Sequence, residues 1–108
     1  MENVLIVFVT VSSQEEGERI GSSLVESKLA ACVNVLPQVS SIFSWQGKIE
    51  KDGEIMLLIK TTSERMDDLV AKIKEMHSYD VPEILAVPVF AGSRDYIDWV
   101  HQETNPKK

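Results

Sequence analysis

The chain has 108 residues, of which 44% are hydrophobic and 26% are charged, and this balance is typical of one globular domain. Lys and Arg number 11 against 17 Asp and Glu, which gives a formal net charge of −6. We therefore expect neither nucleic acid nor a membrane as a partner, because an acidic surface repels phosphates and anionic lipid. Cys32 is the only cysteine, which excludes an internal disulfide and favours a reducing compartment, the cytoplasm.

The first elements are predicted from one apolar run and one capping pattern. Residues 4–9 are rich in β-branched side chains and predict a first strand that ends by Val11. Ser13 with Glu16 three residues later forms a capping box. The apolar residues that follow at helical spacing predict a helix that ends near Leu29.

The next part of the chain has an extended pattern with interruptions. Residues 31–36 predict a strand that is interrupted at Pro37 and resumes over 41–45. A proline inside a strand marks an edge, a bend or a bulge. Turn residues at 46–47 and again at 51–53 predict a hairpin in this region.

The second half repeats the alternation of strand and helix. Residues 55–60 predict a third strand, and the polar residues 61–63 are typical of the start of the amphipathic helix that follows. Residues 83–90 predict a fourth strand. A short helix is expected around residues 96–100, and residues 102–108 are expected to form a frayed tail.

The order β, α, β, β, α, β predicts a ferredoxin-like fold of the α+β class, with an extended hairpin between the second and third strands and a short C-terminal helix, in a single domain 1–108. In a lone sheet of this type the helices cover one face, so apolar and polar residues should alternate along each strand. Residues 4–9 and 55–59 are instead apolar at nearly every position. We therefore predict a homo-oligomer whose subunits pack their sheet faces together.

The motifs of common metal and nucleotide sites are absent from the sequence, which has no CxxC, HxxxH, GxSxG or glycine-rich phosphate loop. The soft and borderline metal donors are Cys32 and His77. Each has a structural alternative: Cys32 as a small buried hydrophobic residue, and His77 as a capping group at a helix end. Any metal site is expected to be completed by several chains or by carboxylates.

Polar and aromatic residues gather at the ends of the predicted elements. Lys60 ends an apolar strand, so its ammonium is expected to pair with a carboxylate such as Glu83 or Glu54, with a purely structural ion pair as the alternative. The two tryptophans fit core or interface anchors as well as ligand stackers. Besides His77, the candidate residues for a ligand cleft or a subunit interface are Trp45, Lys48, Glu54, Lys60, Thr61, Tyr79, Glu83, Tyr96 and Trp99.

Almost the whole chain resembles the CutA family of divalent-cation tolerance proteins. The resemblance lies in blocks that occur in order: Leu29, Ala30, Ala31, Cys32, Val33, Asn34 and Pro37; Ser41, Ile42, Phe43, Trp45, Gly47, Lys48, Ile49 and Glu54; Leu58, Ile59, Lys60 and Thr61; His77, Tyr79, Pro82, Glu83 and Ile84; and Tyr96 with Trp99. It implies a ferredoxin-like homotrimer similar to the PII nitrogen regulators, with sheets facing inward and clefts between subunits. It implies no catalytic reaction, so we expect no enzyme.

The resemblance also implies a link to divalent metals and to copper. Cys32 and His77 match positions of the family and are carried over as metal contacts. Val9 stands where some relatives carry a cysteine, and Met76 where some carry a second histidine. A copper site built on those groups is incomplete here, which leaves one imidazole together with a methionine sulfur suited to Cu(I). Two functions are thus expected: a metal-responsive binding trimer, or a structural or signalling-type interaction trimer without a physiological metal site.

Overall fold

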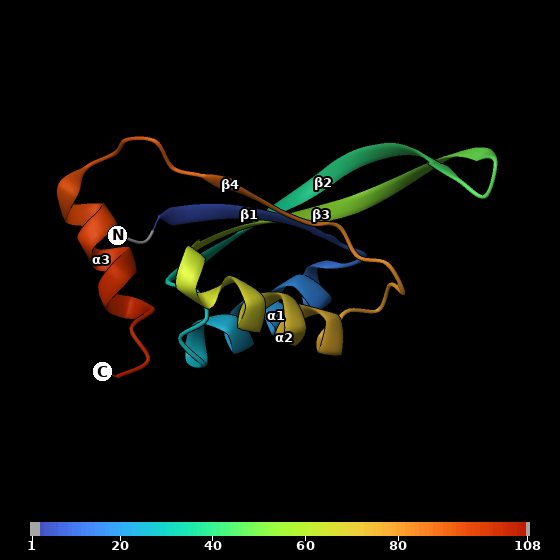
Figure 1. The fold of residues 1–108 in the computed structure, drawn as a ribbon. Coiled ribbons are helices and arrows are strands. Elements are labelled where there is room, and N and C mark those ends of the chain that lie inside the picture. The colour runs from blue at the N-terminus through green and yellow to red at the C-terminus, as the bar shows by residue number, and fades with distance from the viewer. Residues whose placement is uncertain (1–2, 108) are drawn as a thin grey trace.

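The computed structural model describes residues 3–107 and has the ferredoxin-like α+β fold that the sequence predicts (Figure 1). Its four strands form one antiparallel sheet in the order β2-β3-β1-β4. The elements along the chain are β1 (Val4–Val11), α1 (Gln14–Glu26), β2 (Cys32–Trp45), β3 (Lys48–Thr62), the 3₁₀ turn η1 (Ser63–Arg65), α2 (Met66–Met76), β4 (Ile84–Pro88) and α3 (Arg94–Glu103).

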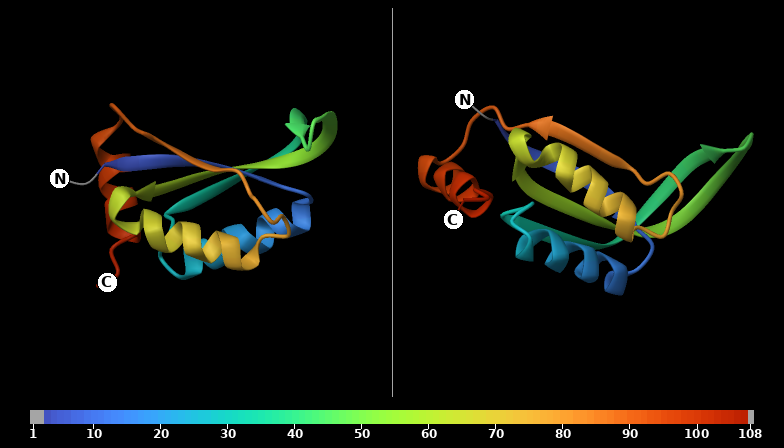
Figure 2. Two further views of the ribbon diagram at one scale, coloured as in Figure 1. Left: turned by 45° about the vertical axis from the view of Figure 1, so that its right-hand side comes forward. Right: turned by 60° about the horizontal axis from the view of Figure 1, so that its bottom comes forward.

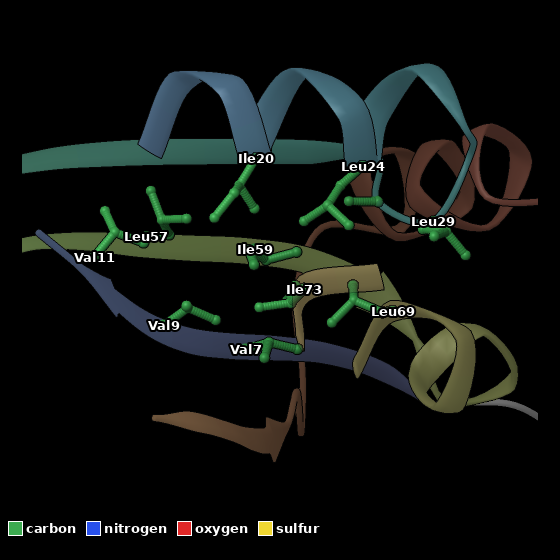
Figure 3. Close-up of a cluster of buried hydrophobic side chains, with 11 residues drawn as sticks. Val7, Val9, Val11, Ile20, Leu24, Leu29, Leu57, Ile59, Leu69 and Ile73 are labelled. Atoms are coloured by element: carbon green, nitrogen blue, oxygen red, sulfur yellow. The ribbon is translucent and has the colours of Figure 1, made fainter. Parts of the chain in front are cut away.

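Helices α1 and α2 lie side by side on one face of the sheet (Figure 2). The core fills the space between them and the two central strands, where side chains from both layers point toward one another (Figure 3). Gly21 allows α1 to approach the sheet closely, because a Cβ there would lie 3.1 Å from Cγ1 of Val33. The fully buried core residues are Val7, Val9, Val11, Ile20, Leu24, Leu57, Ile59, Leu69 and Ile73.

Strands β2 and β3 continue past the rest of the sheet as a two-stranded arm (Figure 1). The arm turns at Gln46 and Gly47, whose φ angles of 52° and 79° are those of a two-residue hairpin turn. The predicted second turn at 51–53 is wrong, because these residues pair with 40–42 inside the ladder. The predicted interruption near Pro37 is confirmed as a bulge.

The bulge lies between Leu36 and Val39 and contains Gln38, which has a φ of 57°. Other boundaries differ from the predicted ones. Helix α1 ends at Glu26, before the predicted end near Leu29. Residues 61 and 62 belong to β3, so the second helix begins only after the 3₁₀ turn. Strand β4 is shorter than predicted and ends at Pro88, although the Val89 N–H still donates to the carbonyl oxygen of Val4 at 2.9 Å. Helix α3 extends through Glu103, two residues into the predicted tail.

The second face of the sheet carries no helix layer. Since Val7 and Leu57 point toward the helices, their neighbours Phe8 and Leu58 point the other way. Helix α3 covers only the end of this face away from the arm, where Val100 packs into a small second cluster (Figure 1). We call the rest of it the open face; its apolar residues are Ile6, Phe8, Leu36, Met56, Leu58, Leu85 and Val87.

Candidate functional site

One group of predicted site residues meets where the open face runs under α3. Cys32 lies directly opposite Lys60 in the β2–β3 ladder, and the Lys60 Nζ atom is 3.9 Å from the Cys32 Sγ atom. The Lys60 ammonium also donates a hydrogen bond to Asn34 Oδ1. Burial, and then the neighbouring Cys32 sulfur, raise the pKa of Tyr96. Tyr96 packs on Trp99 with ring centroids 5.4 Å apart. We call these five residues the Cys32 group.

The predicted pairing of Lys60 with a carboxylate is wrong: within residues 3–107, Lys60 forms no ion pair. Glu54 is six residues away on the same strand, about 20 Å along it, and accepts a hydrogen bond from Tyr79. Glu83 is exposed just before β4. Cross-strand pairing with Cys32 determines where the Lys60 side chain lies.

A second group lies around His77, which follows α2 and has a fully buried side chain. Its Nε2 atom is 2.7 Å from the carbonyl oxygen of Thr10, and its Nδ1 atom accepts a hydrogen bond from the Tyr79 N–H at 2.9 Å. The Tyr79 hydroxyl donates to Glu54 Oε2 at 2.8 Å. Burial and Glu54 raise the pKa of Tyr79. These contacts assign the Nε2–H tautomer to His77, and both ring nitrogens are engaged inside the subunit.

Glu16 is a buried residue of this second group that sequence reasoning missed. Its carboxylate accepts hydrogen bonds from the N–H and hydroxyl of Ser12 and from those of Ser78, and it lies 3.8 Å from His77 Nδ1. Burial alone would raise the pKa of Glu16, but these hydrogen bonds outweigh burial and lower it to about 2. The capping box is half right: Ser13 Oγ accepts from Glu16 N–H, while the Glu16 side chain bonds elsewhere. No local pattern links Glu16 with Ser78.

The structure does not bring the two expected metal contacts together in one subunit. Cys32 is opposite Lys60, which pairs with Ile6 of β1, whereas His77 contacts Thr10. Four residues of β1 separate these points, about 13 Å along the strand. In the part of the chain that the structure describes, no cluster of three or more His, Cys, Asp or Glu side chains is arranged to hold a metal ion.

The remaining predicted residues lie apart from both groups. Trp45 and Lys48 face each other at the exposed tip of the arm. Thr61 is fully buried, and its hydroxyl donates to the carbonyl oxygen of Leu29 at 2.7 Å, so its observed contact is structural. A cavity of about 330 Å³ lies beside the end of α3 and includes none of the predicted site residues. It is lined by Thr62, Glu64, His101, Thr104, Asn105, Pro106 and Lys107.

Comparison with known proteins agrees with this architecture. The family model described as CutA1 divalent ion tolerance protein matches residues 5–103. The chain belongs to the CutA1 family. A divalent-cation tolerance protein CutA from Thermus thermophilus is 44% identical over 99 residues, which cover 92% of this chain and 96% of the relative. The resemblance seen in the sequence is therefore confirmed.

Solved CutA1 structures have the same fold. The Thermus thermophilus structure has a TM-score of 0.91 at 45% identity and covers 97% of this chain and 100% of its own. The Oryza sativa structure has a TM-score of 0.92 at 40% identity, covering 95% and 94%. A structure from Archaeoglobus fulgidus, described as a periplasmic divalent cation tolerance protein CutA, has a TM-score of 0.91 at 41% identity, covering 97% and 100%.

Some CutA relatives are much longer than this chain. A chloroplastic CutA from Arabidopsis thaliana is 40% identical over 93% of this chain, which spans 55% of the plant protein. Among residues 3–107, no helix combines the length and the apolar character needed to cross a bilayer.

Proposed function

We propose that this CutA1-family chain is a homotrimeric divalent-cation tolerance protein that binds a cation, with copper preferred, in clefts between its subunits, and that it catalyses no reaction. The observation that carries the proposal is the open face. Leu85 is 62% exposed and Val87 45% exposed on this face of the subunit. A second copy of the same sheet face is an apolar surface of matching size, and burying it stabilises an assembly.

A cleft between subunits suits the donor atoms of this chain. Four ligands are usual for a bound transition metal, and the described part of one subunit offers no cluster of three. Cys32 is a partly exposed thiol at the edge of the open face, so a neighbouring subunit packed there would add donors to it. A sulfur ligand favours copper over hard cations such as magnesium.

His77 is the weaker of the two candidate ligands. In the Nε2–H tautomer only Nδ1 has a lone pair that could bind a cation. This lone pair already accepts a hydrogen bond from the Tyr79 N–H. Binding a cation there requires that hydrogen bond to break. We therefore assign the main donor role to Cys32. The cytoplasm is proposed as the compartment because the thiol is unpaired.

Titration calorimetry with Cu(I), Cu(II) and Zn(II) tests the proposal on the wild type, Cys32→Ala and His77→Ala, with light scattering to follow the assembly. We expect a trimer that binds copper, a loss of affinity of about tenfold or more in Cys32→Ala, and a smaller loss in His77→Ala. Unchanged copper affinity in both variants, with the assembly intact, contradicts the proposed site. A monomeric wild type contradicts the proposed assembly.

The second candidate is an interaction trimer without a physiological metal site. The engaged nitrogens of His77 favour it. Under this function the Cys32 group holds subunits together. Cys32→Ala would then dissociate the assembly, and the wild type would bind each cation no better than the variants do.

A further inference from the structure

Glu16 joins the connection between β1 and α1 to the segment after α2, which lies 62 positions away in the sequence. It lies in the first turn of α1, and its carboxylate contacts Ser12 at the end of β1 and Ser78 in the segment after α2. The distances from the carboxylate oxygens are 3.1 Å to Ser12 N, 2.8 Å to Ser12 Oγ, 2.8 Å to Ser78 N and 3.2 Å to Ser78 Oγ. All four partners are donors, which suits an ionised carboxylate because it only accepts.

Ser78 lies between the two rings of the second group. The Glu16 carboxylate accepts hydrogen bonds from both the N–H and the hydroxyl of Ser78. These bonds hold the backbone on either side of Ser78, which carries His77 and Tyr79. The two rings contact each other with centroids 4.7 Å apart. From them, hydrogen bonds lead to Thr10 on β1 and to Glu54 on β3. Glu16 reaches these bonds through its hydrogen bonds to Ser78, and its carboxylate also lies 3.8 Å from His77 Nδ1.

We propose that Glu16 is the positioning residue of the His77–Tyr79 segment, holding the His77 ring as its Nε2–H tautomer and the Tyr79 hydroxyl against Glu54. A role in helix capping alone does not explain the contacts, since the capping-box bond would return to the N–H of Ser13, whereas the observed bonds go to Ser12 and Ser78. The proposal rests on the proposed function only where it concerns cation binding.

Glu16→Gln is the sharpest variant, because it keeps the shape and replaces one acceptor oxygen by an NH₂ group. That NH₂ group must face an N–H donor, either at Ser12 or at Ser78, so one buried hydrogen bond is lost and two donors oppose each other. Glu15→Gln is the matched control. Glu15 lies in the same first turn but is exposed, so Glu15→Gln removes the same charge from the helix start and leaves the four hydrogen bonds of the Glu16 carboxylate in place.

The test is ¹⁵N nuclear magnetic resonance of the imidazole rings at about pH 8, above the ordinary titration range of histidine. The chain has only two histidines, so His101→Gln assigns the signals. We expect one Nε2–H tautomer for His77 in the wild type and in Glu15→Gln, and mixed tautomers in Glu16→Gln. The Ser78 amide should exchange about tenfold faster in Glu16→Gln. A tautomer and an exchange rate equal to those of Glu15→Gln overturn the proposal.

A milder variant keeps the test decisive if Glu16→Gln does not fold. Ser12→Ala with Ser78→Ala removes both hydroxyl donors and leaves both N–H donors. It should lower the protection factor of the amide at position 78, which corrects for the intrinsic exchange rate of the new residue, about threefold, and an unchanged protection factor argues against the positioning role.

Copper titration of Glu16→Gln and Glu15→Gln separates this proposal from the proposed function. Weaker copper binding in Glu16→Gln, but not in Glu15→Gln, supports a role of the Glu16 hydrogen bonds in positioning the cation site. If the wild type binds no copper, the proposed function fails, while the tautomer of His77 still decides the role of Glu16.

Discussion

The two faces of the sheet are built from the same strands and yet differ in how they are covered. On the helix-covered face, Val7 and Leu57 are fully buried inside one subunit. On the open face, their neighbours Phe8 and Leu58 are only partly buried. Both faces are apolar, so composition does not distinguish them. One face is completed by the helices of this chain, whereas the other keeps its apolar side chains partly exposed, and this difference is the reason for proposing that a second copy covers it.

Leu57→Ala should cause the largest loss of stability among the changes that compare the two faces. It leaves a cavity beneath α1 and is expected to lower the free energy of unfolding by about 4 kcal/mol, measured by urea denaturation. Leu58→Ala is the matched change on the open face and should act mainly through self-association. Equal losses in the two variants, independent of protein concentration, would show that the faces do not differ.

Acidification should cause the second largest loss of stability, because it protonates Glu16 on the helix-covered side of the sheet. The hydrogen bonds in the folded chain lower the pKa of its carboxyl from the ordinary value of 4.5 to about 2. A lowered pKa gives stability that is present above about pH 4.5 and is lost as the pH falls toward 2. The loss is about 3 kcal/mol, followed by urea denaturation across this pH range. Glu16→Gln should flatten that part of the profile, while Glu15→Gln should keep it.

Phe8→Asp breaks the open face alone. A carboxylate buried between subunits costs about 2 kcal/mol or more, so the association should weaken by at least about tenfold in sedimentation equilibrium. The far-ultraviolet circular dichroism should stay unchanged. Ser22→Asp adds the same charge at an exposed position of α1 and serves as the control. Association unaltered in Phe8→Asp would mean that another surface joins the subunits.

Dilution of the protein should have the smallest effect on stability. If unfolding is coupled to dissociation, an about hundredfold dilution lowers the melting temperature by roughly 5 °C, measured by calorimetry at several scan rates. Phe8→Asp should remove this dependence. A melting temperature that does not change with concentration in the wild type contradicts the coupling.

Local patterns in the sequence predicted most of the fold. The apolar run that begins at Val4 predicted β1, and Ser13 is the N-cap of α1, its side chain accepting the Glu16 N–H. The turn at Gly47 was also predicted. Residues 51–53 were misread because their turn composition is overridden by cross-strand pairing.

The candidate sites depended on pairing across the chain, which composition does not encode. The predicted residues Cys32 and Lys60 do meet, but only the strand register shows it. The partner of Glu54 is Tyr79, from the segment after α2. Glu16 contacts Ser78 across 62 positions, and nothing near either residue predicts that contact.

The arm formed by β2 and β3 also bears on solubility. Ile42 is 66% exposed and Ile49 is 73% exposed, and both lie on a two-stranded ribbon with free edges, which is the kind of segment that nucleates intermolecular β-sheets. Charged residues interrupt this ribbon from Lys48 to Asp52 and act against such stacking. In the proposed assembly, a neighbouring subunit that covers this ribbon would protect the chain from aggregation as well as from unfolding.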